Sequence, residues 1–136
     1  MSERKAILVT GSSHGIGAAT VIAFAKDGYD VGINYNKTPE GAQSVAEECR
    51  RYGVDAQIYQ CDVGRRDQCE RMLNAFINHF GRIDVLVNNA GVNKIVSSYD
   101  LDMADFRSVL DTNLVGPMIC CQEAGKIMRD TGGGSI

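Results

Sequence analysis

The chain alternates between short apolar runs and longer stretches in which apolar residues recur with helical spacing. The short runs predict buried strands, and the recurring pattern predicts helices with one buried face. The predicted strands are Ala6–Thr10, Asp30–Tyr35, Asp55–Cys61 and Ile83–Asn88. The predicted helices are Gly15–Asp27, Pro39–Gly53, Arg66–Phe80 and Asp102–Arg129.

Strands and helices therefore alternate along the whole chain, with an irregular segment expected only over Val92–Tyr99. This order predicts an α/β fold: a Rossmann-type, doubly wound parallel sheet with helices on both faces. Ser135 and Ile136 resemble the start of a fifth strand, so we expect a sheet truncated before that strand is complete. No linker or repeat divides residues 1–136, which are expected to form a single domain.

Composition narrows the range of partners. The formal net charge is −3 and the basic residues form no stripe, so nucleic acid is not an expected partner. No apolar segment approaches the length of a membrane span or a signal sequence, and we expect a cytoplasmic protein without a membrane partner. The five cysteines lack Cys-x-x-Cys spacing. They therefore favour reduced thiols over a disulfide framework or a metal site.

The first candidate binding segment lies between the first predicted strand and the first predicted helix. There, residues 10–17 read Thr-Gly-Ser-Ser-His-Gly-Ile-Gly. Glycine tolerates positive φ and leaves the backbone open to a close ligand. A helix N-terminus adds unpaired N–H groups and the positive end of the helix dipole. The spacing Gly11-x-x-x-Gly15-x-Gly17 therefore predicts a pyrophosphate-binding loop, with a plain tight turn as the alternative.

Three further motifs complete a family resemblance. They are Asp62-Val63 after the third strand, Asn88-Asn89-Ala90-Gly91 after the fourth, and Asn113 in the last helix. With the glycine loop, they make the whole chain resemble the N-terminal half of a short-chain dehydrogenase/reductase, in the branch of 3-oxoacyl-carrier-protein reductases and glucose dehydrogenases. The resemblance implies an NAD(P)-binding Rossmann domain, a small-molecule carbonyl or alcohol substrate, and a homo-oligomer (a dimer or tetramer).

The resemblance also implies which residues contact the cofactor. The candidates are Gly11, Ser13, His14, Gly15, Ile16, Gly17, Asn36, Lys37, Asp62, Val63, Asn89, Ala90 and Gly91. In the family, the aspartate at Asp62 accepts the adenine amino group and the Val63 N–H bonds a ring nitrogen, although Asp62 also suits a turn or helix cap. The Asn88–Gly91 segment would hold a ribose, with Asn88 bracing the sheet, or would form a structural turn.

The choice between NADP and NAD depends on the end of the second strand, which reads Asn34-Tyr35-Asn36-Lys37. An NAD site of this kind has a carboxylate there for the ribose 2′-hydroxyl, and this stretch has none. Lys37, Asn36 and His14 are suited to a 2′-phosphate, so NADP is favoured and NAD is the alternative. Lys37 and His14 would otherwise be solvated loop residues. His79 lies on a helix without ligand spacing and is expected to be structural.

Asn113 lies four residues before Pro117 in the last predicted helix. Proline has no N–H to donate to the carbonyl four residues back, so we expect a kink and a freed Asn113 carbonyl. The resemblance implies that this carbonyl holds the water of a proton relay, which makes Asn113 the candidate catalytic residue. The alternative is an asparagine tolerated at a bend.

The resemblance also implies a serine after the fifth strand and a Tyr-x-x-x-Lys pair. No tyrosine among these 136 residues has a lysine four positions on, and Ser135 precedes the fifth strand. Two functions remain open. The first is an NADP-dependent oxidoreductase that transfers hydride between NADP(H) and a carbonyl or alcohol, and the alternative is a non-catalytic NAD(P)-binding fragment or module. In either case the 136-residue chain alone is expected to be inactive, and the sequence does not identify the substrate.

Overall fold

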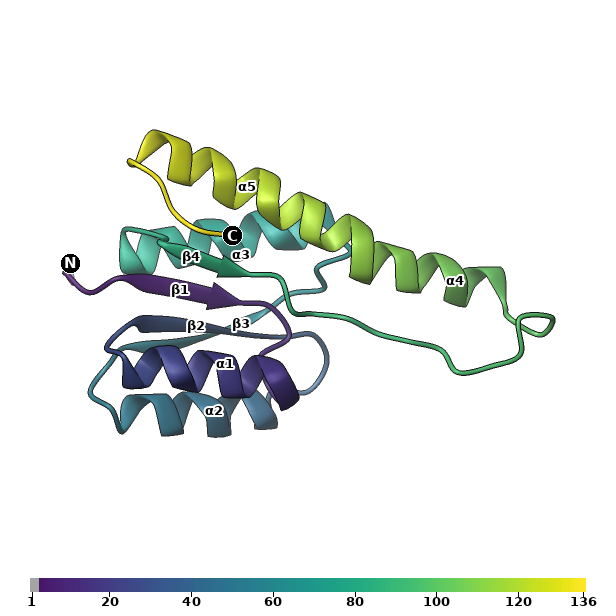
Figure 1. Ribbon diagram of the computed structural model, residues 1–136, viewed down its shortest axis with the longest axis horizontal. Helices are drawn as coiled ribbons and strands as arrows, with labels where there is room; N and C mark the ends of the chain where they lie inside the picture. Colours follow the sequence, from purple (N-terminus) through teal and green to yellow (C-terminus); the bar gives the residue numbers. More distant parts are fainter. Residues whose placement is uncertain (1–2) are drawn as a thin grey trace.

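The computed structural model describes residues 3–136, in which parallel strands alternate with helices (Figure 1). The strands are β1 (Ala6–Val9), β2 (Asp30–Tyr35), β3 (Ala56–Gln60) and β4 (Val85–Val87). The helices are α1 (Gly15–Lys26), α2 (Glu40–Arg50), α3 (Arg66–Phe80), α4 (Met103–Leu110), η1 (Asp111–Val115) and α5 (Gly116–Asp130). Each predicted element is present, with its ends within a few residues of the predicted ones.

The sheet has the order β3-β2-β1-β4, and all neighbouring strands are parallel. Leu8 of β1 aligns with Gly32 of β2 on one side and with Leu86 of β4 on the other. The chain thus moves outward from β1 to β3 and then returns to place β4 beside β1. In such sheets ligands bind beyond the carboxyl ends of the strands, at the point where the order reverses. The predicted doubly wound α/β fold is confirmed.

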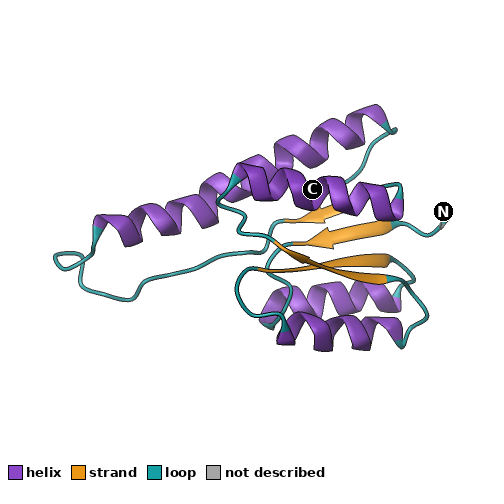
Figure 2. Ribbon diagram, turned by 180° about the vertical axis from the view of Figure 1, so that it is seen from behind, coloured by secondary structure: helices purple, strands orange, loops and turns teal. Residues whose placement is uncertain are grey.

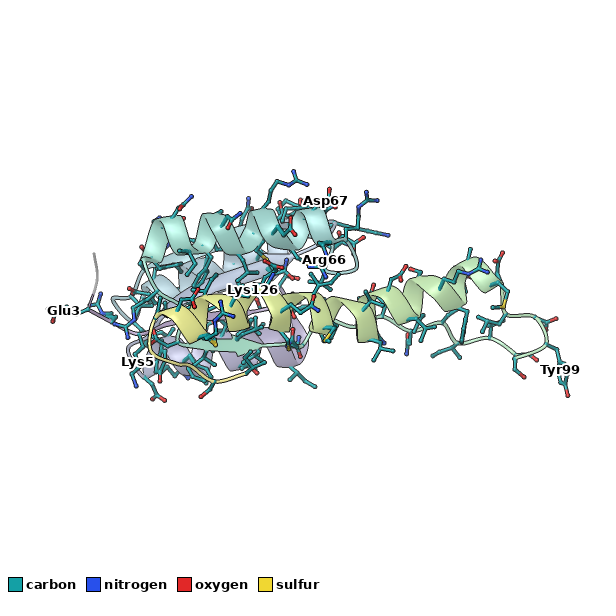
Figure 3. The ribbon with its side chains drawn as sticks, turned by 90° about the horizontal axis from the view of Figure 1, so that it is seen from above. Glu3, Lys5, Arg66, Asp67, Tyr99 and Lys126 are labelled. Carbon is teal, nitrogen blue, oxygen red and sulfur yellow. The ribbon has the colours of Figure 1, made fainter. Side chains whose placement is uncertain are left out.

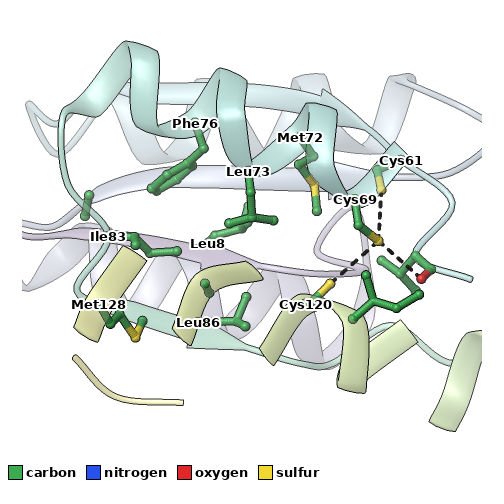
Figure 4. Packing of buried hydrophobic residues seen from close by; sticks show 14 of the residues in the cluster. Leu8, Cys61, Cys69, Met72, Leu73, Phe76, Ile83, Leu86, Cys120 and Met128 are labelled. Atoms are coloured by element: carbon green, nitrogen blue, oxygen red, sulfur yellow. Dashed lines mark hydrogen bonds between the residues drawn. The ribbon is translucent and has the colours of Figure 1, made fainter. Parts of the chain in front are cut away.

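Helices cover both faces of the sheet (Figure 2). α1 and α2 pack over one core and α3 and α5 over the other. Successive residues of a strand point to opposite faces. Accordingly, Ile7 and Val9 of β1 enter the α1–α2 core, whereas Leu8 enters the α3–α5 core with Phe76 (Figure 4). Burial on both faces explains why β1 reads as an uninterrupted apolar run.

The stretch predicted as one helix over Asp102–Arg129 is instead divided by a π-helical turn. α4, η1 and α5 follow one another directly, and within η1 the Gly116 N–H donates to the Asp111 carbonyl. Pro117 lies in the first turn of α5. A π turn widens the helix by one residue, and such turns are frequent at functional sites. The irregularity expected near Pro117 is therefore present as this wider turn, and the freed Asn113 carbonyl stays a prediction.

An irregular arm joins β4 to α4 and carries Tyr99 at its tip, where the side chain is 98% exposed (Figure 3). The segment predicted to be irregular over Val92–Tyr99 is confirmed. An ion pair of 3.3 Å between Lys94 and Asp105 joins the arm to α4. In the described part of the chain, no helix has the length and apolar character needed to cross a membrane.

The outer edge of β4 is partly paired by the last residues of the chain. The Ser135 N–H donates to the Asp84 carbonyl at 2.9 Å, and the Leu86 N–H donates to the Ser135 carbonyl at 3.0 Å. Ser135 also forms a parallel bridge with Val85. The prediction that a further strand begins at Ser135 therefore agrees with the structure.

Asp84 ties the start of β4 to the start of β1. Its Oδ2 accepts the Ala6 N–H at 2.8 Å, and its two carboxylate oxygens accept hydrogen bonds from Arg82, each of 2.7 Å. Partial burial alone would raise the pKa of Asp84, but the bonds from Arg82 and Ala6 outweigh it and hold that pKa below its usual range. The ionised carboxylate is therefore a stabilising group.

An Asp84→Asn variant tests this contribution. When the pKa of a carboxyl group is lower in the folded state than in the unfolded state, its ionisation stabilises the folded protein. This stabilisation is complete above the unfolded-state pKa and is lost as the pH falls through the folded-state pKa. The substitution is expected to lower the free energy of unfolding by about 1–2 kcal/mol at neutral pH and by progressively less below about pH 4. Urea unfolding followed by circular dichroism across this pH range measures the difference. Asp100→Asn, at an exposed position, is the control; an equal loss at low and neutral pH would contradict the assignment.

Candidate cofactor site

A cleft of about 480 Å³ opens at the carboxyl ends of the strands. Segments that follow all four strands form its walls. Most of the predicted cofactor residues line it, namely Gly11, Ser13, His14, Gly15, Ile16, Asn36, Asp62, Val63, Asn89, Ala90 and Gly91. Gly17, Lys37 and Asn113 are not among the lining residues. Residues from four separate parts of the sequence thus converge on one cavity.

The loop after β1 requires glycine at two positions for backbone conformation. Gly11 has φ +62° and Gly15 has φ +60°, both in the left-handed region that glycine favours. A Cβ at Gly11 would also lie 2.7 Å from the Cα of Ala90, which follows β4. The loop therefore passes directly against the opposite wall of the cleft.

Gly17 packs closely against the loop and the turn after β4, and its contact with the cofactor stays a prediction. It lies in the first turn of α1, where a Cβ would collide with the Gly11 carbonyl oxygen and lie 2.5 Å from Asn89 Nδ2. Its lack of a side chain lets α1 begin close behind the loop, and it does not itself line the cleft. Because His14 is the residue before α1, the exposed first turn of the helix faces the cleft through Gly15 and Ile16.

Asn89 and Thr10 join the ends of β1 and β4. The Asn89 Nδ2 donates to the carbonyls of Thr10 and Gly11, at 3.1 and 3.0 Å. In return, Thr10 Oγ1 accepts the N–H groups of Asn89 and Ala90, both at 3.0 Å. The expectation that Asn88 braces the sheet is corrected here: its Nδ2 contacts Cys121 Sγ at 3.3 Å, and Asn89 makes the bracing bonds.

Asn34 joins the glycine loop to the end of β3. Its side chain is 2% exposed, and its Oδ1 accepts the Gly11 N–H at 2.8 Å. Its Nδ2 lies 3.2 Å from each of three carbonyl oxygens, those of Tyr35, Tyr59 and Cys61. The backbone of Asn34 also exchanges hydrogen bonds with Ser12, each of 3.0 Å. One buried amide at the end of β2 thus positions the segments that follow β1 and β3.

Asp62 makes the turn interaction that was the alternative prediction for it, and its contact with adenine stays a prediction. Its Oδ1 accepts the Gly64 N–H at 3.0 Å, which is the turn-stabilising interaction. Its own N–H donates to Gln68 Oε1 at 2.8 Å, which fixes Asp62 against the first turn of α3. The residue also lines the cleft. The turn therefore holds Asp62 at one wall of the cleft.

The three candidates for a 2′-phosphate lie at the mouth of the cleft. His14, Asn36 and Lys37 are all exposed, and Lys37 follows directly after a lining residue. His14 Nδ1 lies 3.1 Å from Ser13 Oγ. The backbone carbonyl of Asn36 accepts a hydrogen bond of 2.9 Å from Gln60 Nε2. This bond therefore does not involve the side-chain amide of Asn36. No carboxylate is present over residues 34–37.

Asn113 makes a contact that the sequence reading did not anticipate. Its Oδ1 accepts the Val92 N–H and its Nδ2 donates to the Val92 carbonyl, both at 2.8 Å. The amide thus pairs with the backbone of the arm as a neighbouring strand would. Because Val92 and Thr112 line the cleft, this pair fixes the wall on the α4–α5 side.

The sequence profile of the short chain dehydrogenase family matches residues 5–136. The chain belongs to this family. Among curated relatives, the 3-oxoacyl-[acyl-carrier-protein] reductase FabG of Staphylococcus aureus is 37% identical over 136 residues, which is 100% of this chain and 55% of the relative. An uncharacterised oxidoreductase of Methylorubrum extorquens is 39% identical over 134 residues, 98% of this chain and 53% of that protein. The chain thus spans about half the length of the curated relatives it matches.

Solved structures of similar proteins share this fold. A putative short-chain alcohol dehydrogenase from Sinorhizobium meliloti has a TM-score of 0.91 at 36% identity, covering 98% of this chain and 52% of its own. An NAD⁺-bound xylitol dehydrogenase has a TM-score of 0.89 at 29% identity, covering 96% of this chain and 50% of its own. The family resemblance stated from the motifs is confirmed.

Several residues that line the cleft were absent from the predicted site: Asn34, Tyr35, Cys61, Val92 and Thr112. One signal was available for Asn34, because a polar residue inside an otherwise apolar strand needs buried hydrogen-bond partners. His79, predicted to be structural, pairs with Asp55 at 2.6 Å across the far end of the sheet and lies outside the cleft.

Proposed function

We propose that this chain is the cofactor-binding part of an NADP-dependent oxidoreductase that transfers hydride between NADP(H) and a carbonyl or alcohol substrate. The observation that carries the proposal is the cleft itself, in which the glycine loop and the first turn of α1 meet Asp62 and the Asn89–Gly91 turn. The second candidate is a non-catalytic NAD(P)-binding module. It is favoured by the lack of any Tyr-x-x-x-Lys sequence among these 136 residues.

The chain's own residues fit a dinucleotide. The loop places backbone and no side chain at Gly11 and Gly15, which suits a pyrophosphate at the start of α1. Asp62 and Val63 would receive the adenine edge, and Ala90 and Gly91 leave room for a ribose. The nicotinamide supplies or accepts the hydride when bound. The residues described above bind and orient the cofactor, and Asn113 fixes the wall beside it through Val92.

The proposal of NADP over NAD rests on charge at the mouth of the cleft. A 2′-phosphate would be repelled by a carboxylate and attracted by Lys37 and by a protonated His14. Asn36 offers an amide donor at the same rim, where the NAD-type carboxylate is lacking. Two solved relatives are described as an NAD⁺-bound xylitol dehydrogenase and an NADH-dependent reductase, so NAD remains the alternative.

We also propose that the whole protein is a homo-oligomer. Apolar side chains are exposed along α4, η1 and α5, namely Phe106, Leu110, Leu114 and Met118. An exposed row of this kind marks a surface that is covered in the working protein.

The first experiment measures cofactor binding and turnover by the 136-residue chain. Isothermal titration is expected to show NADPH binding at least about tenfold tighter than NADH, with no oxidation of NADPH by ketones or acyl thioesters. Binding without turnover is expected because the side-chain amide of Asn113 cannot transfer a proton as a general acid. Tighter binding of NADH would refute the NADP assignment, and detectable turnover would refute the expected inactivity.

Asn36→Asp provides a sharper test of the same rim. A carboxylate at this position would repel the 2′-phosphate and could accept the 2′-hydroxyl of NADH. The variant is expected to lose about tenfold or more in NADPH affinity while NADH affinity is unchanged or improved. Asn78→Asp, on the exposed face of α3, makes the same chemical change far from the cleft and should alter neither affinity. Parallel losses of NADPH affinity in both variants would point to net charge and away from a local 2′-phosphate site.

A further inference from the structure

Three of the five free cysteines meet beneath the cleft, between the end of β3, α3 and α5 (Figure 4). We call Cys61, Cys69 and Cys120 the thiol cluster. Cys69 is central: its Sγ lies 3.9 Å from the Sγ of Cys61 and 3.9 Å from that of Cys120. All three residues are at most 1% exposed. Over residues 3–136 no group of three His, Cys, Asp or Glu side chains is arranged to hold a metal ion, so metal binding does not explain the cluster.

The surroundings of Cys69 favour its thiolate. The thiols of Cys120 and Cys61 both donate toward Cys69 Sγ, and these two bonds lower the pKa of Cys69 while they raise the pKa of each donor. Cys69 also lies in the first turn of α3, where the positive end of the helix dipole stabilises an anion. A thiolate is the nucleophilic form of cysteine. Cys69 is therefore the reactive member of the cluster.

Cys61 connects the cluster to the cofactor cleft. It is one of the residues that line the cleft, and it follows β3 immediately before Asp62 and Val63. Its carbonyl accepts a hydrogen bond from Asn34 Nδ2. When Cys69 is protonated, its thiol donates to the Val63 carbonyl at 3.3 Å. Cys69 itself is 0% exposed and does not line the cleft, so an oxidant as small as hydrogen peroxide would have to reach it past Cys61. A bound dinucleotide would cover this approach.

We propose that Cys69 and Cys61 form a hydroperoxide-sensitive dithiol, a modification site whose disulfide impairs the cofactor cleft. The Cys69 thiolate attacks one peroxide oxygen, the O–O bond breaks, and the departing hydroxide takes a proton to leave as water. The sulfenic acid so formed on Cys69 is attacked by the Cys61 sulfur. The S–S bond forms, the S–O bond breaks, and the hydroxyl leaves as water with the Cys61 proton. Two thiols are oxidised by two electrons and one peroxide is reduced to two waters.

The disulfide would move the adenine wall of the cleft. Its formation brings two sulfur atoms from 3.9 Å to about 2.05 Å and removes the Cys69 bond to the Val63 carbonyl. Asp62 and Val63 lie between the joined cysteines, so the short segment that carries them is constrained in a new position. Reduced affinity for NADPH follows, and this consequence rests on the proposed function. Cys61 is chosen over Cys120 as the partner because Cys61 lies on the cleft, where the oxidant arrives.

The test treats the folded 136-residue chain with hydrogen peroxide in a Cys121→Ser background, which removes the partly exposed thiol. Mass spectrometry is expected to show the loss of two hydrogen atoms and a peptide linking Cys61 to Cys69. Cys69→Ala should abolish the link, whereas Cys120→Ala and Cys49→Ala should keep it. Cys49 is buried in the other core, where burial raises its pKa to about 11, so its resistance to alkylation reports that the variants which retain Cys49 are folded. A Cys69–Cys120 link, or sulfinic acid without any link, would overturn the assignment.

A second measurement separates this proposal from the proposed function. NADPH is expected to slow the oxidation several-fold, and the oxidised chain is expected to bind NADPH at least about tenfold more weakly than the reduced chain. Equal binding by both forms would overturn the effect on the cleft. If the reduced chain itself fails to bind NADPH, the proposed function fails while the mapped disulfide still supports the modification site.

Discussion

Gly17→Ala is expected to abolish measurable NADPH binding and to lower the free energy of unfolding by about 2–4 kcal/mol. The added Cβ would collide with the Gly11 carbonyl oxygen and lie 2.5 Å from Asn89 Nδ2. Both contacts are with groups already held by hydrogen bonds, since Asn89 Nδ2 itself donates to the Gly11 carbonyl at 3.0 Å. Relief of the collision therefore requires the loop, α1 or the turn after β4 to move.

The matched control is Gly125→Ala, because Gly125 is also helical but a Cβ there would meet no atom within 4 Å. Alanine in a helix is favoured over glycine, so this variant is expected to gain about 0.5–1 kcal/mol. The chain has no tryptophan. Unfolding is therefore followed by circular dichroism in urea, and binding by the fluorescence of NADPH. NADPH affinity retained in Gly17→Ala would contradict the close packing described here.

Asn34→Ala is the second substitution with a large expected effect. It removes the acceptor of the Gly11 N–H and the donor shared by the carbonyls of Tyr35, Tyr59 and Cys61. Buried polar groups that lose a partner cost about 1–3 kcal/mol each. A loss of about 3 kcal/mol or more in the free energy of unfolding is expected, together with NADPH affinity weakened at least about tenfold.

The control for Asn34→Ala is Asn78→Ala, at an exposed position of α3. This variant should change neither the free energy of unfolding nor the free energy of NADPH binding by more than about 0.5 kcal/mol. NADPH affinity measured well below the unfolding transition separates loss of the site from loss of the fold. A destabilised Asn34→Ala chain that still binds NADPH normally would show that Asn34 supports the sheet without positioning the cofactor loop.

Much of the architecture follows from local pattern. β1 is buried on both faces, so its residues form one apolar run that is recognisable without any structure. α2 and α3 each bury one stripe, which produces their regular apolar spacing. The strand–glycine–helix order placed the candidate loop at the carboxyl edge of the sheet, because parallel strands joined by helices all end on the same side.

The ends of the strands and the division of the long last helix were harder to predict from the sequence. β4 contains only Val85–Val87, because pairing with β1 sets its length and the apolar run from Ile83 does not. The π turn at Asp111–Val115 has the same apolar spacing as an ordinary helix. Pro117 indicated an irregularity, but the hydrogen-bond register that accommodates it depends on packing against neighbouring elements.

By itself the sequence determined the α/β class, the position of the glycine loop and the membership in a family, since each depends on residues close together in the chain or on fixed motifs. Only the tertiary structure decided how Asn34 joins three strand ends, how Asn113 holds Val92, and how the thiol cluster forms. Three of the deciding pairs, Asn34 with Gly11, Asn113 with Val92 and Cys120 with Cys69, lie 23, 21 and 51 positions apart in the sequence. Such pairs are created by strand order and helix packing, which no local pattern encodes.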